Sequence, residues 1–128
     1  MVTAQVSCLV CPSEDPEKVK RAVLNVFPDA SLEETERGFE GTAGLDRFKE
    51  LIRRQKILDS SRSMMFKGIR DGYITLHLNK QVAFVGKVSF TEPKTVLGTI
   101  RVIIETDAPE RLIDIVAPRT VDGEEARS

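Results

Sequence analysis

The sequence predicts an α+β fold: a mostly antiparallel sheet backed by helices, in the order β-α-β-α-α-β-β-β-α. Three observations lead to this prediction. Apolar and polar residues alternate over Val2–Val10, which is the period of a half-buried strand. Apolar residues recur at helical spacing over 16–27. The C-terminal half then contains three further segments with strand character.

Length and composition predict one globular domain. The chain has 128 residues, of which 41% are hydrophobic and 30% charged, enough to bury a core without disulfide or metal support. No apolar run approaches the roughly 18 residues that span a bilayer, and the first residues lack the basic start of a secretory signal. We therefore expect a cytoplasmic protein with a single domain at 1–117 and a polar tail at 118–128 that frays.

The N-terminal half continues with a helix and an acidic segment. Asp15 and Pro16 predict the start of a helix at 16–27, and Pro28 ends it. The stretch 32–40 is acidic and poor in apolar residues. It predicts an edge strand whose charges prevent aggregation.

Three glycines at a spacing of three residues, Gly38, Gly41 and Gly44, precede the helical segment that begins at Leu45. A glycine-rich entry to a helix can hold a phosphate, and a G-x-x-G loop is also the clamp of KH domains. A KH loop joins two helices, whereas this one is predicted to join a strand to a helix. We therefore favour glycines that serve a turn and a helix cap.

The remaining elements are a second helical segment over Ile57–Arg70, strands at Tyr73–Leu78, Val82–Phe90 and Thr99–Glu105, and a short helix at Pro109–Val116. The segment Asn79–Gln81 is predicted to connect the first two of these strands as a hairpin. In the strand that begins at Tyr73, the apolar residues face the core. Tyr73, Thr75 and His77 are therefore expected on the opposite face of the sheet.

The two cysteines form a C-x-x-C pair, Cys8 and Cys11. A closed zinc site needs four ligands, and His77 is the only histidine in the sequence. A thioredoxin-like site would place the pair where a strand turns directly into a helix, which is not predicted here. We expect buried strand thiols rather than metal or redox chemistry.

Charge is distributed unevenly along the chain, although the net charge is only −1. Residues 1–46 contain four basic and nine acidic groups, residues 47–101 contain twelve and four, and residues 102–128 contain three and seven. This asymmetry is expected if one face of the protein meets phosphate. Acidic and basic segments that neutralise each other across the fold give the same pattern.

The densest basic surface is predicted on the two helical segments of the middle block, with Arg47, Lys49, Arg53, Arg54, Lys56, Arg62, Lys67 and Arg70. The helical wheel places Arg62 close to the apolar stripe. A charge in that position needs a partner. The partner is either an acid, such as one on an adjacent strand, or a phosphate received in a groove.

The sequence shows no catalytic motif. Hydrolytic or transfer chemistry requires a nucleophile with its base, a metal cluster or a phosphate loop with its lysine. Ser60, Ser61 and Ser63 lie in a predicted helix, far in sequence from His77. We therefore expect a protein that is not an enzyme and carries no cofactor and no metal.

Five segments carry a family resemblance: Phe39–Gly41, Leu51–Arg62, Leu78–Ala83, Leu97–Ile100 and Leu112–Pro118. They resemble a family of small archaeal proteins labelled predicted exosome subunits or RNA-binding proteins. The resemblance covers nearly the entire chain. One departure is Val82, where relatives often have alanine.

The resemblance implies a fold similar to the large-subunit ribosomal protein that binds 5S rRNA, commonly as a homodimer. It also implies a role for the basic block. The positions that we expect to contact RNA phosphate and sugar are Arg47, Arg53, Arg54, Lys56, Arg62, Asn79, Lys80 and Gln81.

The sequence thus predicts an RNA-binding accessory protein of translation or RNA processing. Its expected partner is structured RNA, with ribosomal RNA as a candidate, and no membrane partner is expected. Few aromatic residues are available for base stacking, and Tyr73 is the best strand candidate. The rival prediction is a homodimeric interaction module that binds no nucleic acid. Its acidic surface would come from residues 31–40.

Overall fold

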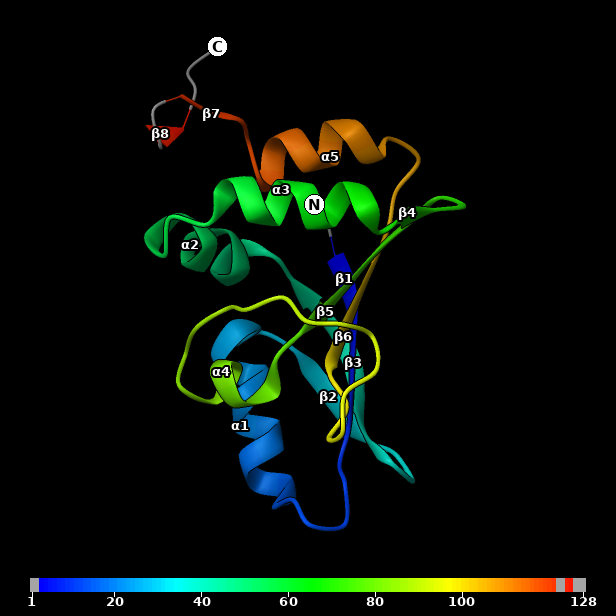
Figure 1. Cartoon of the computed structure of the whole chain (residues 1–128). Coiled ribbons are helices and arrows are strands. Elements are labelled where there is room, and N and C mark those ends of the chain that lie inside the picture. Colours follow the sequence, from blue (N-terminus) through cyan, green and yellow to red (C-terminus); the bar gives the residue numbers. More distant parts are fainter. Residues whose placement is uncertain (1–2, 122–123, 126–128) are drawn as a thin grey trace.

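The central element of the fold is an antiparallel sheet (Figure 1). The computed structural model describes residues 3–121 and 124–125. The sheet has six strands in the order β2-β3-β1-β6-β5-β4. The strands are β1 (Thr3–Leu9), β2 (Ser31–Glu34), β3 (Gly38–Gly44), β4 (Ile69–Arg70), β5 (Tyr73–Leu78) and β6 (Ile100–Glu105). The predicted α+β class with an antiparallel sheet is confirmed.

Helices cover one side of this sheet in Figure 1. They are α1 (Pro16–Val26), α2 (Asp46–Arg54), α3 (Leu58–Lys67), α4 (Lys80–Phe84) and α5 (Pro109–Val116). Helices α1 and α4 pack together at one end, whereas α3 and α5 lie side by side at the other (Figure 1). Two short strands, β7 (Thr120–Val121) and β8 (Glu124–Glu125), form a separate pair. The predicted tail 118–128 includes residues 122–123 and 126–128, which lie outside the described residues.

The alternation of side chains explains why one face of the sheet is covered. In β1, Ala4, Val6 and Cys8 are buried, whereas Thr3, Gln5 and Leu9 are exposed. Strands β5 and β6 follow the same rule, and their buried residues are Ile74, Leu76, Leu78, Ile100, Val102 and Ile104. Burial of these side chains supplies the hydrophobic contribution to folding. The predictions for β1 and β5 are confirmed, including the outward position of Tyr73, Thr75 and His77.

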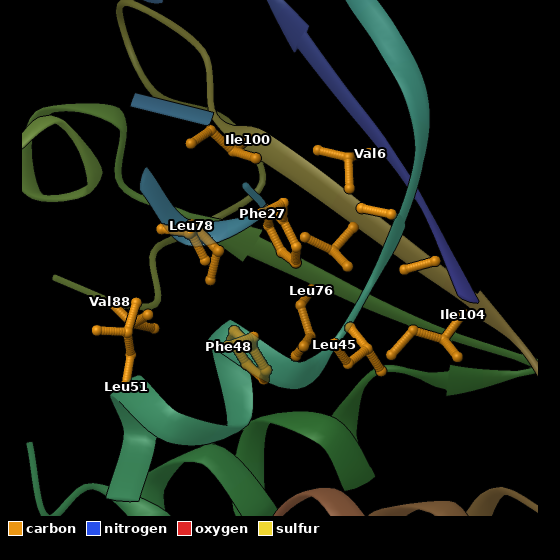
Figure 2. Close-up of a cluster of buried hydrophobic side chains, with 14 of the residues drawn as sticks. Val6, Phe27, Leu45, Phe48, Leu51, Leu76, Leu78, Val88, Ile100 and Ile104 are labelled. Atoms are coloured by element: carbon orange, nitrogen blue, oxygen red, sulfur yellow. The ribbon is translucent and has the colours of Figure 1, made fainter. Parts of the chain in front are cut away.

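An aromatic cluster joins the helices to the sheet (Figure 2). The Phe48 ring of α2 stacks on Phe27, with ring centroids 6.2 Å apart and an interplanar angle of 9°. Phe90 meets the same ring edge-on, at 6.4 Å and 81°. Phe48 is only 1% exposed, so it links α1, α2 and the segment after α4 within one core.

The predicted strand at Val82–Phe90 is wrong. Asn79 caps helix α4: its side-chain oxygen accepts a hydrogen bond from the Val82 amide at 3.0 Å. Asparagine is a favoured N-cap, and this cap starts a helix where the sequence predicted a hairpin at Asn79–Gln81. Within that stretch, Phe90 retains a strand contact as an isolated bridge to Leu78.

The predicted edge strand at 32–40 is in fact a hairpin of β2 and β3, and of these two strands β2 lies at the edge of the sheet. Gly38 and Gly41 therefore lie within a strand, not in a loop or a helix cap. A Cβ atom on Gly41 would stand 2.0 Å from the Ser31 carbonyl oxygen. This close approach of two backbones requires the glycine, so neither a phosphate loop nor a turn with a helix cap explains it.

We predict that Phe48→Ala lowers the free energy of unfolding by about 3–5 kcal/mol, because it removes a buried ring and leaves a cavity. Chemical denaturation measures this change. Val85→Ala, at a position 68% exposed, is the control and should change stability by about 0.5 kcal/mol or less. An equal effect of the two substitutions would contradict the assigned core.

Candidate nucleic-acid interface

Lys80, predicted to contact RNA, is instead part of a buried ion pair. Its side chain is 6% exposed, and its ammonium nitrogen lies 2.9 Å from Glu14 Oε1. The ammonium also donates to the carbonyl oxygens of Leu9, at 2.6 Å, and of Leu97. Its three donors are thus all used inside the protein. The prediction for Lys80 is wrong, because it rested on an exposed hairpin that the chain does not form.

Glu14 is the acidic partner in this cluster. Burial acts to raise the pKa of its carboxyl group, but hydrogen bonds from the Cys11 amide and the Lys80 ammonium outweigh it, and the pKa lies below its usual value of 4.5. The Cys11 amide donates to Oε1 at 2.9 Å. Glu14 therefore stays ionised at neutral pH. It binds the β1–α1 connection directly, through the Cys11 amide, and the segment that contains Leu97 indirectly, through Lys80.

The other two residues of the predicted hairpin are arranged by helix α4. Asn79 is half-buried and its side chain is engaged in the N-cap. Gln81 is exposed on the first turn of α4. This pair therefore lies at the start of α4, not on α2, the helix that carries Arg47 and Arg54.

Arg53 and Arg62 both bind the C-terminal end of α5. Arg53 donates to the carbonyl oxygens of Val116 at 3.1 Å and of Ile115 at 3.3 Å. Arg62 donates to the Ala117 carbonyl at 3.2 Å and forms an ion pair with Asp114 at 2.7 Å. These cations satisfy carbonyls that a helix end leaves without intrahelical partners.

Arg62 has a structural partner rather than an open phosphate groove. Its side chain is 16% exposed and also lies over the Phe66 ring, 5.1 Å from the centroid. Its acidic partner, Asp114, is on helix α5 and not on an adjacent strand. The helical wheel correctly predicted that this charge would need a partner.

Three predicted residues, Arg47, Arg54 and Lys56, remain at the surface of α2 and the turn that follows it. Arg47 and Arg54 share one carboxylate, that of Glu50, so this group of side chains keeps a net positive charge. Exposed pairs of this kind contribute little stability. Lys56 forms no ion pair within the part of the chain that the structure describes. With Lys49, these residues form what we call the α2 basic surface: Arg47, Lys49, Arg54 and Lys56.

Lys56 has a left-handed backbone with φ of 58°. It occupies the position after the helix end where glycine is usual: the Lys56 amide bonds the Arg53 carbonyl at 3.1 Å, and the Ile57 amide bonds the Ile52 carbonyl at 3.0 Å. Lysine has a steric penalty at this position that glycine avoids. The turn also directs the chain from α2 into α3.

The cysteines occupy protein contacts. Cys8 is buried, and burial raises the pKa of its thiol to about 11. The Cys11 thiol donates to the Leu97 carbonyl at 3.3 Å. Among the described residues, no group of three His, Cys, Asp or Glu side chains is arranged to hold a metal ion. Nor is any helix within the described ranges long and apolar enough to cross a membrane.

The face of the sheet opposite the helices carries a graded row of charges. Cross-strand pairing aligns Glu33 with Glu40, Glu40 with Ser7, Ser7 with Arg101, and Arg101 with His77. This row therefore runs from two glutamates at one end to Arg101 and His77 at the other. Burial first, and Arg101 second, lower the pKa of His77 below 6.5, so its imidazole is largely neutral at neutral pH.

A groove of ≈ 750 Å³ runs along the outer edge of β5. Its lining comes from the end of α3, from β4 and β5, and from residues 90–93. Lys67, Arg70 and His77 contribute to it, together with the acidic residue Glu92. The sequence predicted Lys67 and Arg70 in one helical segment, Ile57–Arg70, whereas α3 ends at Lys67 and Arg70 lies in β4. It gave no signal that both residues line a groove together with His77.

A comparison with protein families finds a match over most of the chain. The model of a family described as RNA binding matches residues 3–106. This span includes all six strands of the main sheet, together with helices α1 to α4. The chain belongs to this RNA-binding family.

Archaeal UPF0201 proteins are similar over almost the full chain. A UPF0201 protein of Thermococcus onnurineus is 42% identical over 127 residues, which cover 93% of each chain. A crystal structure of a UPF0201 protein from Methanococcus jannaschii has a TM-score of 0.87 at 36% identity and covers 98% of this chain and 99% of that one. The chain therefore also belongs to the UPF0201 family. A UPF0200/UPF0201 protein of Archaeoglobus fulgidus is 39% identical, but the chain spans only 39% of its length.

We predict that Glu14→Gln destabilises the protein at neutral pH, because it leaves the Lys80 ammonium buried without its counter-charge. The expected loss is about 3 kcal/mol, at the low end for a broken buried pair, since two carbonyls still accept from Lys80. The lowered pKa of Glu14 contributes stability above pH 4.5, and this contribution is lost as the pH falls through the folded-state pKa. Denaturation at several pH values should show the two proteins converging in acid. A difference that is constant with pH would contradict this role of Glu14.

Proposed function

We propose that this protein binds RNA and that its α2 basic surface contacts the phosphate backbone. The match to the RNA-binding family carries the proposal. The α2 basic surface supports it, because exposed arginine and lysine side chains supply sequence-independent affinity for nucleic acid. Of the eight predicted residues, Arg53, Arg62 and Lys80 have structural roles, and Asn79 and Gln81 lie at the start of α4. The proposed site therefore keeps Arg47, Arg54 and Lys56, and Lys49 is added to it.

The backbone at Lys56 also supports the proposal. A lysine in a left-handed turn costs stability relative to glycine, and such strain tends to persist at functional positions. Lys56 lies at the junction of α2 and α3, where it is exposed and no described acid pairs with it. A phosphate is the partner that this arrangement suits best.

We infer an accessory protein of translation or RNA processing that acts by binding rather than by catalysis, without a cofactor, in the cytoplasm. The resemblance to the ribosomal protein that binds 5S rRNA suggests structured RNA as the ligand. Association with the exosome is a further expectation from the family resemblance. Backbone contacts predict modest sequence specificity.

The double variant Arg54→Gln/Lys56→Gly tests the α2 basic surface. We expect the affinity for duplex RNA to fall, and the slope of log affinity against log salt to decrease by about one for each phosphate that is no longer neutralised. Lys56→Gly alone should raise the free energy of unfolding by roughly 0.5–1 kcal/mol, because it relieves the left-handed strain. Fluorescence anisotropy and denaturation measure the two effects.

The matched control is Lys18→Gln/Arg21→Gln, which removes two exposed charges from a different helix, α1. It should leave the RNA affinity within about twofold of wild type, since only long-range screened charge is removed. Equal losses of affinity in the two double variants would indicate diffuse charge attraction. They would contradict a defined site on α2.

A second candidate function is a homodimeric interaction module, and the charge row on the open face favours it. A two-fold axis that runs parallel to the strands and passes over Ser7 would stack two open faces. It would lay β2 and β3 of one copy over β5 and β6 of the other, so that Glu40 faces Arg101 of the second copy. Isologous interfaces are self-complementary in this way.

For this candidate, Glu40→Arg and Arg101→Glu should each weaken self-association, because like charges would meet. The double exchange should restore it, since opposite charges face each other again. Sedimentation velocity measures the association. A wild-type protein that stays monomeric at every concentration tested would eliminate the candidate.

A further inference from the structure

The groove along β5 differs in character from the α2 basic surface. It is concave, and its volume of ≈ 750 Å³ lies in the range that small ligands occupy. Its apolar lining includes Met64, Ile69 and Phe90, all of them half-buried. A flat or convex contact with duplex backbone needs no such hollow.

Two cations of this groove, Lys67 and Arg70, are exposed. Neither forms an ion pair with any residue within 3–121 and 124–125. This contrasts with Arg62 on the same helix as Lys67, which is held by Asp114. The groove therefore presents positive charge that no ion pair of the described residues neutralises.

An aromatic residue stands across the strand pair from one of these cations, Arg70. Tyr73 is 45% exposed and is the cross-strand partner of Arg70. It lies on the same face of β5 as Thr75, two residues along the strand, and Thr75 lines the groove. Tyr73 is therefore adjacent to two lining residues of the groove, Arg70 across the strand pair and Thr75 along β5.

Polar groups able to read a base edge complete the site. His77 lines the groove, and its Nδ1 lies 3.0 Å from the Thr99 hydroxyl oxygen, which fixes the ring. Its Nε2 is on the other side of the ring. Thr75 and Thr91 add hydroxyl groups that both donate and accept hydrogen bonds.

We propose that this groove binds an unpaired nucleotide of single-stranded RNA, with Lys67 and Arg70 on its phosphates and Tyr73 stacked on a base. The inference rests on the proposed RNA-binding function and adds a second site to it. Single-stranded segments are recognised by stacking on aromatic side chains together with a cationic path for the backbone. The α2 basic surface offers the cations, but the aromatic residue of α2, Phe48, is buried in the core.

The experiment compares two probes, a short single-stranded oligouridylate and an RNA duplex, with the full chain and fluorescence anisotropy as the readout. The groove variants are Lys67→Gln/Arg70→Gln and Tyr73→Leu. We expect Tyr73→Leu to lower the single-strand affinity about tenfold, the effect of removing one stacked base. In low salt, Lys67→Gln/Arg70→Gln should lower the single-strand affinity more than Tyr73→Leu does. Tyr73→Leu should leave the duplex affinity within about twofold of wild type.

Lys18→Gln/Arg21→Gln on α1 is again the charge-matched control, and thermal melting verifies that each variant folds. A loss of single-strand affinity in this control equal to that of the groove charge variant would overturn the groove as a site. So would unchanged single-strand binding in both groove variants.

The two proposals fail in different ways. If the wild-type chain binds the duplex but not the oligouridylate, the groove proposal fails and the function of the α2 basic surface stands. If it binds neither probe, both fail. If the groove variants instead change only self-association in sedimentation velocity, the face belongs to a second copy of the chain and the groove proposal is overturned.

Discussion

The division of the sheet into a buried apolar face and an open, mostly polar face is the constraint on which the rest of the structure depends. Because side chains alternate along β1, β5 and β6, burial of one set under the helices leaves the other set at the surface. The open face can therefore carry Tyr73, His77 and Arg101 without any cost to the core. The same constraint fixes the cross-strand register that produces the charge row and brings Arg70 next to Tyr73.

Basic residues that look equivalent in the sequence have different roles in the fold. Arg53, Arg62 and Lys80 satisfy buried or helix-end carbonyls, and Arg62 and Lys80 also pair with acids. Their removal would destabilise the protein whether or not it binds RNA. Arg54 and Lys56 are different, because the fold gains little from their charges. The proposed RNA-binding surface therefore consists of basic residues of α2, and of the turn after it, that have no such structural role.

Periodicity was sufficient to predict β1, β5, β6, α1 and α5, because each shows one clear repeat over its length. It failed after Asn79, where four consecutive apolar residues fit neither period and the N-cap decided the outcome. For the site, the helical wheel predicted that Arg62 needs a partner, since that depends on one helix alone. The burial of Lys80 and the groove at Arg70 could not be predicted, because both depend on contacts between segments far apart in the sequence.

The most direct test of RNA binding at defined sites is to crosslink the full chain to 4-thiouridine-labelled RNA in cell extract and to identify the crosslinked peptides by mass spectrometry. We expect crosslinks to peptides that contain the α2 basic surface and the groove residues Lys67 to Tyr73. We expect no enrichment on α1, whose exposed charges lie elsewhere. Crosslinks spread over α1 and the other helices alike, or no recovered RNA, would contradict the claim that this protein binds RNA at defined sites.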